Sequence, residues 1–255
     1  MLKKTIVLFF LSISAHANFD LTLGAAARSW PSLGPEVNLE SGYNFVFWGE
    51  GNKRNPLYGL IRPSFIIRSA AVINSLDARF EFYPISFISL ALGHKYINSN
   101  WDRFNFYDCK KVRCKGEIHR DYLEFKMAMS FSGITTVGKI LMSRNSYSDP
   151  NNELKPVAEF RYASLAKNGS DQMYSSRYIL GYKAFGGMIG IMADYVNFEK
   201  SDETYNMDLL IYAHKRESST YIWGIGQFVS THWSGRGLIG VFQIKTNFLP
   251  TKKLF

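Results

Sequence analysis

The feature that most constrains this fold is a two-residue alternation of apolar and polar side chains that recurs along the chain. In residues 236–248, Leu238, Phe242 and Ile244 fall on one face of an extended segment, while Lys245 falls on the other. Several upstream segments of similar length repeat the pattern. A period of two is that of β-strands with one apolar face, so the sequence predicts an all-β protein.

The start of the chain has the organisation of a secretory signal. A basic beginning is followed by an apolar run over residues 6–11 and an Ala-x-Ala cleavage site that ends at Ala17. The apolar run is too short to cross a bilayer as a helix, which takes about 20 residues. We therefore predict a cleaved signal peptide over residues 1–17 and a single domain over residues 18–255. A retained membrane anchor is the alternative.

No later stretch approaches a transmembrane helix, because charged residues interrupt every apolar run. An exported chain without a helical span is soluble in the periplasm, secreted, or a β-barrel. The chain has 20 Phe, 15 Tyr and 5 Trp in 255 residues, many of them near predicted strand ends. This content is typical of the aromatic girdles of membrane barrels. A secreted β-sandwich rich in aromatic residues is the alternative.

The alternation predicts a series of strands separated by stretches rich in turn-forming residues. The thirteen candidate strands cover residues 19–28, 36–47, 57–70, 76–82, 88–95, 122–131, 134–144, 157–165, 177–184, 189–195, 207–213, 221–229 and 236–248. Bacterial barrels with both chain ends in the periplasm have an even number of strands. We therefore interpret segment 157–165 as an extension inside an extracellular loop. The prediction is 12 strands, with 14 in reserve.

The connections between these strands are of two kinds. Short turns near Pro84, Gly133 and Gly186 contrast with a long polar loop over residues 98–116. Short turns on one side and long loops on the other are typical of outer-membrane barrels. The long loop holds Cys109 and Cys114, which can close a small ring by a disulfide in an oxidising compartment. A metal site would need more ligands than this pair.

The signal, the amphipathic strands, the asymmetry of the connections and the closing segment 236–248 together resemble outer-membrane β-barrel proteins of Gram-negative bacteria. The resemblance implies an antiparallel transmembrane β-barrel in the outer membrane. It implies outer-membrane lipids, lipopolysaccharide and the barrel-assembly machinery as partners. In this class the last strand ends in an aromatic residue that serves as an insertion signal. The candidates are Phe242, Ile244, Phe248 and Phe255, although Pro250 should stop the strand before the terminal residue.

If the apolar faces contact lipid, the opposite faces line the lumen. The charged residues predicted to line it include Arg62, Arg68, Arg79, Glu81, Lys95, Glu124, Lys126 and Lys183. In strand 207–213 the same rule places Met207, Leu209 and Ile211 against lipid and Asp208 in the lumen. Buried charges need compensation, so we expect ion pairs to occupy much of a narrow interior.

The leading functional interpretation is a non-enzymatic barrel, either a small pore or a structural protein. Inward arginines would give a pore a weak preference for small anionic solutes. The formal charge is +9, or +7 without Lys3 and Lys4, and the basic residues are scattered rather than clustered. Scattered charge on an exported chain does not favour nucleic acid as a partner.

Two other functions are kept as alternatives. His232 and Ser234 are the nearest approach to the histidine and serine of a lipid-modifying enzyme, although a histidine beside an aromatic girdle is equally ordinary. A protease would need acidic pairs and a histidine near the outer rim, such as Asp194, Asp208 and His214. The other class is a surface receptor or adhesin that binds through the 98–116 loop. No metal spacing or nucleotide motif is present, so no cofactor is predicted.

Overall fold

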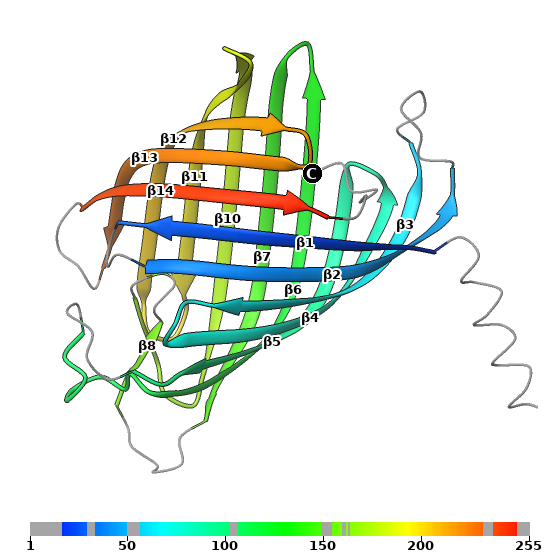
Figure 1. Ribbon diagram of the computed structural model, residues 1–255. Helices are drawn as coiled ribbons and strands as arrows, with labels where there is room; N and C mark the ends of the chain where they lie inside the picture. Colours follow the sequence, from blue (N-terminus) through cyan, green and yellow to red (C-terminus); the bar gives the residue numbers. More distant parts are fainter. Residues whose placement is uncertain are drawn as a thin grey trace, which may run out of the picture.

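Twelve antiparallel strands form a closed barrel in the computed structural model (Figure 1). The barrel strands are β1 (Ala17–Arg28), β2 (Gly34–Trp48), β3 (Gly59–Ser69), β4 (Ile73–Ile85), β5 (Ile88–Ser99), β6 (Gly116–Phe131), β7 (Ile134–Ser148), β10 (Ser170–Ala184), β11 (Gly187–Phe198), β12 (Glu203–Arg216), β13 (Ser219–Ser230) and β14 (Gly237–Asn247). Each strand pairs with its neighbours in this order, and blue β1 pairs with red β14 to close the wall.

The structure describes residues 17–29, 34–49, 57–101, 107–148, 155–159, 162, 164–231 and 237–248. The predicted signal peptide lies almost wholly outside them, so it stays a prediction. No helix among the described residues is long and apolar enough to cross a membrane.

The predicted architecture of 12 antiparallel barrel strands is confirmed. The surplus candidate, segment 157–165, is indeed not part of the barrel wall. It contains β8 (Val157–Glu159) and β9 (Ser164–Ala166), which pair with each other in a separate two-stranded sheet. We call residues 155–166 the inner hairpin, because their described side chains pack against the inner face of the barrel wall.

The two ends of the barrel differ in their connections. At one end, here named the short-turn end, β4–β5, β6–β7, β10–β11 and β12–β13 are joined by two-residue turns. In the turns Ser132-Gly133 and Phe185-Gly186 all four residues have positive φ. This is the conformation of the type I′ turn, whose twist matches that of paired strands. The opposite, long-loop end carries the two longest connections, residues 100–115 and 149–169.

The outer face of the barrel is largely apolar. Exposed aliphatic and aromatic side chains occur around the whole wall, among them Leu39, Phe65, Phe80, Leu92, Leu123, Met142, Leu180, Ile191, Leu210, Ile225 and Leu238. Toward the short-turn end they are joined by ring pairs such as Phe47 with Phe82 and Tyr212 with Trp223, each with centroids 5.7 Å apart. An apolar band bordered by aromatic rings is suited to the hydrocarbon and interface of a bilayer.

The inner face has two different halves. The charged half is the inner face of β1–β7, where most of the buried ionic side chains lie. The apolar half is the inner face of β10–β14, whose buried residues include Met173, Val196, Phe198, Tyr205, Met207, Leu209, Ile211, Phe228 and Ile239. The apolar half also includes the ion pair between Arg177 and Asp194.

The orientation predicted for β12 was wrong. Met207, Leu209 and Ile211 are buried on the inner face, whereas Asp208 is exposed on the outer face beside Gln227 of β13, 3.4 Å between its Oδ2 and the amide nitrogen. The reason is that both faces of this strand carry apolar residues, so the alternation does not identify the face toward lipid. The inner row is apolar because the inner hairpin packs against it.

Candidate functional site: the lumen of the barrel

An ionic cluster around Arg62 joins the first four strands near the short-turn end. The Arg62 side chain is fully buried, and its Nη2 lies 2.6 Å from Asp20 Oδ1 and 2.9 Å from Glu40 Oε1. Its Nη1 forms a third ion pair, with Glu81. Asn44 donates a further hydrogen bond to Asp20, at 2.5 Å. One guanidinium therefore pairs with three carboxylates, and Arg79 lies 3.7 Å from one of them, Glu81.

A second network occupies the middle of the charged half. The Tyr122 hydroxyl donates to Asp77 at 2.6 Å and accepts from Arg79 Nε at 3.0 Å. On the neighbouring strand pair, Lys139 Nζ lies 2.5 Å from Glu124 Oε2. The Tyr122 contacts join β6 to β4 across the intervening β5, and the Lys139–Glu124 pair joins the adjacent strands β7 and β6.

The residues predicted to line the lumen occupy distinct places. Arg62, Arg68, Arg79, Glu81, Lys95 and Glu124 lie on the inner face in or beside the two networks. Lys126 is half-buried on the inner face of β6. Lys183 is exposed, one residue from the short-turn end of β10. The alternation did not single out the apolar residues that also face the lumen, such as Met207 and Ile239.

The inner hairpin enters the lumen at the long-loop end and packs against the apolar half. Ala158 and Ala166 are fully buried. The Tyr162 ring meets the rings of Phe198 and Tyr205 edge-on, with centroids 6.3 and 5.6 Å apart. The segment predicted to be an extension inside an extracellular loop is therefore folded into the lumen, because its apolar side chains contact an apolar wall there.

Two contacts fasten the inner hairpin to the rest of the lumen. Glu159, on β8, accepts a hydrogen bond of 2.7 Å from Arg120 on β6, and Arg120 also donates to Asn145 on β7 at 2.6 Å. All three side chains are buried. The hairpin is thus held to the apolar half by packing and to the charged half by an ion pair.

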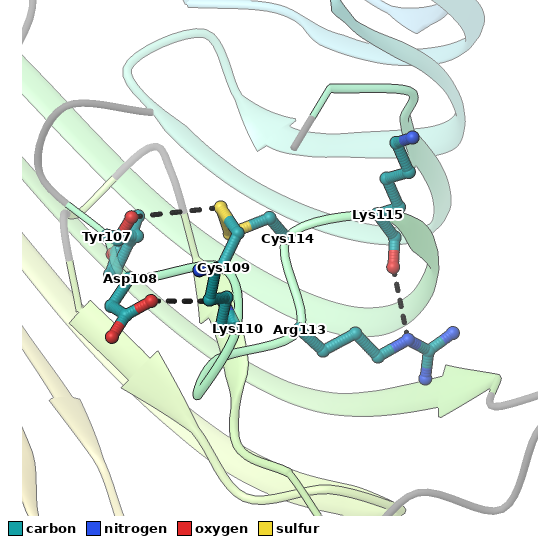
Figure 2. Close-up of a disulfide and its surroundings, with 7 residues drawn as sticks. All are labelled: Tyr107, Asp108, Cys109, Lys110, Arg113, Cys114 and Lys115. Atoms are coloured by element: carbon teal, nitrogen blue, oxygen red, sulfur yellow. Dashed lines mark hydrogen bonds between the residues drawn. A yellow bond between two sulfur atoms is a disulfide. The ribbon is translucent and has the colours of Figure 1, made fainter. Parts of the chain in front are cut away.

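The disulfide loop, residues 107–115, lies against the inner hairpin and contains the Cys109–Cys114 disulfide (Figure 2). The backbone nitrogen of Arg113 donates to Pro156 at 2.8 Å, and that of Ala158 donates to Arg113 at 3.0 Å. The Tyr107 hydroxyl donates to the Ser164 carbonyl at 2.7 Å, and burial raises its pKa well above the ordinary value. The disulfide loop and the inner hairpin therefore form one unit at this end.

Two adjoining cavities lie inside the wall. The outer cavity, of about 520 Å³, lies among the disulfide loop, the inner hairpin and the barrel strands at the long-loop end. The inner cavity, of about 70 Å³, lies in the middle of the barrel. They share five lining residues, namely Arg68, Lys95, Tyr162, Arg177 and Asp194. The shared residues place the two cavities next to each other along the lumen.

Cationic side chains outnumber acidic ones around both cavities. Among the described residues, six basic and four acidic ones line the outer cavity, and six basic and three acidic ones line the inner cavity. Most of the acidic groups at the outer cavity have partners of their own: Glu159 pairs with Arg120, Asp194 with Arg177, and Glu117 accepts from the Tyr96 hydroxyl at 2.7 Å. The electrostatic potential of the lumen is therefore expected to be positive.

The remaining candidate residues lie elsewhere. His232, Ser234 and Phe255 are outside the described residues. On β14, Phe242 and Ile244 alternate with inward Val241 and share the outer face. Phe248, directly after the strand, is also exposed. Among the described residues no group of three or more His, Cys, Asp or Glu could hold a metal ion.

The closed antiparallel wall, the apolar exterior and the ionic interior define the class of this protein. They are the features of an outer-membrane β-barrel, the class predicted from the sequence. No protein-family model and no curated protein matches the sequence.

Several solved barrels are similar to the chain at low identity. The KdgM porin has 9% identity and a TM-score of 0.44, with 90% of this chain and 99% of that chain covered. An outer-membrane channel from Pseudomonas putida F1 has 8% identity and a TM-score of 0.46, with 91% and 95% covered. An anion-selective porin from Comamonas acidovorans has 7% identity and a TM-score of 0.40, with 90% and 98% covered. Likenesses this distant carry no information on solute or partner.

Proposed function

We propose that this protein is a non-enzymatic pore of the outer membrane that admits small anionic solutes. The observation that carries the proposal is the pair of adjoining cavities, which extend from the long-loop end to the middle of the barrel and are both lined by an excess of cationic side chains. A narrow space with cationic walls favours anions over cations.

The inner hairpin would set the size of solute that this pore admits. It occupies part of the lumen at the entrance and is fixed there by the Arg120–Glu159 ion pair and by Tyr162. A barrel of this strand number already has a narrow interior. We therefore expect small conductance steps and exclusion of large solutes, in contrast to a wide general porin.

Features of the outer wall support the placement in the membrane. The short-turn end would face the periplasm, and the long-loop end the cell exterior. Toward the long-loop end the outer face becomes polar, with His94 bonded to Asp121 at 2.7 Å and Arg144 exposed nearby on the next strand. Such a polar zone is suited to lipopolysaccharide head groups. The outward Phe242 and Ile244 of β14 are available to the barrel-assembly machinery during insertion.

The second candidate is a structural barrel whose lumen does not conduct. The observation that favours it is the Arg62 cluster, whose fully buried side chains fill part of the lumen near the short-turn end. A polar plug and a pore with charged walls both contain inward charge, so only transport separates them.

Conductance in planar bilayers tests the proposal. The refolded protein should give discrete steps in KCl, and an absence of steps above background would leave the structural barrel. Lys95→Glu should weaken the anion preference, because Lys95 lines both cavities. The matched control is Arg216→Glu, an exposed residue at the short-turn end of β12 that lines neither cavity. An equal effect of both variants would argue against the lumen as the path.

A further inference from the structure

The outer cavity has one apolar wall and one mixed wall that carries a cationic group. In the order of strands around the barrel, β13 stands opposite β5, so β12–β14 face β4–β6 across the lumen. From the β12–β14 side, Met207, Ile239 and Val241 line the cavity. From the other side it is lined by Lys95 and Ile97 of β5 and Ile118 of β6, and Arg68 of β3 lies beyond. An apolar wall thus faces a mixed wall whose cationic group is Lys95.

We infer that the outer cavity binds amphipathic organic carboxylates, in which an acid group is joined to an apolar body. Lys95 and Arg68 would hold the carboxylate, because charge-assisted hydrogen bonds are the strong ones in a partly buried site. Met207 and Ile239 would hold the apolar body, because apolar surface leaves water there. The inference rests on the proposed function, since it names the solute class of the same lumen.

Three properties of the site favour this ligand class over an inorganic anion. The volume of about 520 Å³ is within the range of small-molecule sites. The apolar wall is not needed to pass chloride, and uncovered apolar surface facing water is unfavourable. The inner hairpin covers the neighbouring part of that wall with Val157 and Tyr162, both of which also line the cavity, so the apolar lining continues onto the hairpin.

The acidic residues of the lining repel a carboxylate less strongly than the basic residues attract it. Glu159 and Asp194 are each in an ion pair with an arginine. Lys95 is the basic residue best placed for a ligand that reaches inward, because it lines both the outer and the inner cavity. A ligand with its carboxylate at Lys95 would lie with its body toward β12 and β14.

Calorimetric titration of the protein in lipid nanodiscs tests the inference without relying on conduction. The probes are the linear carboxylates from acetate to octanoate, with octylammonium and octanol as matched molecules that lack the negative charge, and empty nanodiscs as the blank. Octanoate should bind, and each methylene buried against the apolar wall should tighten binding by up to about fourfold. Octylammonium should bind at least about tenfold more weakly than octanoate.

Two variants separate the contributions of the two walls. Lys95→Gln should weaken acetate and octanoate alike, by about tenfold. Met207→Gln should weaken octanoate while leaving acetate unchanged, and so should flatten the dependence on chain length. The controls are Lys183→Gln and Met188→Gln, at inward positions that do not line the outer cavity. Heat-modifiable migration on detergent gels shows which variants are folded.

Affinity that does not change from acetate to octanoate, or equal binding of octylammonium, would overturn the inference. So would octanoate binding that survives both Lys95→Gln and Met207→Gln in folded protein. Conduction of KCl without octanoate binding would contradict the carboxylate site and leave the pore intact. Octanoate binding without KCl conduction would contradict the pore and support the site. The two proposals therefore fail separately.

Discussion

The charged and apolar halves of the inner wall bury their side chains in different ways. In the charged half, most ionic groups find their partners on other strands of the same wall, as Arg62 of β3 does with Asp20, Glu40 and Glu81 on β1, β2 and β4. In the apolar half, the side chains of β10–β14 are covered by the inner hairpin, a segment from the long connection between β7 and β10. The first half is completed mainly within the sheet, and the second needs a piece of loop.

This difference shows which face of a membrane barrel the environment constrains more tightly. Lipid requires an apolar exterior around the whole circumference. The interior contacts water, charges or another part of the chain, so either polar or apolar side chains are stable there when something covers or compensates them. Substitutions in each half can therefore test whether that half depends on the partners that the structure assigns to it.

The largest effect is expected from Arg62→Met in the charged half. Removal of the guanidinium breaks the ion pairs with Asp20, Glu40 and Glu81, and two of these carboxylates, Asp20 and Glu81, are buried. We therefore expect a loss of about 5 kcal/mol in the free energy of unfolding. Urea unfolding of the protein folded into lipid vesicles measures this. Lys183→Met, at an exposed position, is the control and should stay within about 0.5 kcal/mol of wild type. A loss below about 1 kcal/mol for Arg62→Met would break the account of the charged half.

The corresponding change in the apolar half is Phe198→Ala. Phe198 is fully buried among apolar residues and touches the ring of Tyr162, so its truncation should cost about 3–4 kcal/mol of unfolding free energy. The control is Phe131→Ala, whose ring is 85% exposed at a turn. Equal effects of the two truncations in the same unfolding assay would mean that the inner apolar wall is not packed.

The ion pair that holds the inner hairpin to the charged half is tested by Glu159→Gln. The change removes the charge that Arg120 meets at 2.7 Å, and we expect a loss of about 2 kcal/mol. Because the pair holds the inner hairpin rather than the wall, the main consequence should be a looser hairpin and larger or noisier conductance steps. Unchanged single-channel currents in this variant would show that the hairpin does not restrict the path.

The smallest effect, with the opposite sign, is expected from Asp208→Leu. Asp208 is on the outer face of β12, where an acidic group faces lipid at some cost. Its replacement by Leu should stabilise the barrel by about 1 kcal/mol in vesicles. A marked destabilisation would indicate that Asp208 faces the lumen, which is the orientation predicted from the sequence.

The barrel was predictable from the sequence because lipid imposes a regular pattern on one face of every strand. The period of two located the strands, and the even-number rule excluded segment 157–165 from the wall. The neighbours Phe80 and Leu92 on the outer face, and Arg62 and Arg79 on the inner face, followed the pattern without exception. The Cys109–Cys114 disulfide followed from the short spacing of the two cysteines.

The apolar part of the lumen was not predictable by the same rule. In β12, Leu209 faces inward and Leu210 outward, so the sequence shows apolar residues on both faces. The inward row is stable only because Tyr162 and Val157 reach it from a distant connection, and such a contact leaves no periodic signal. The cavity between that row and Lys95 depends on the same contact.

The reversal potential of the refolded protein in a planar bilayer under a KCl gradient tests the central claim most directly. The two adjoining cavities of the lumen are lined by more cationic than acidic side chains. The pore should therefore conduct chloride in preference to potassium, and the reversal potential should have the sign of an anion-selective pore. A potential of the opposite sign, or a bilayer that stays silent with folded protein inserted, would contradict it.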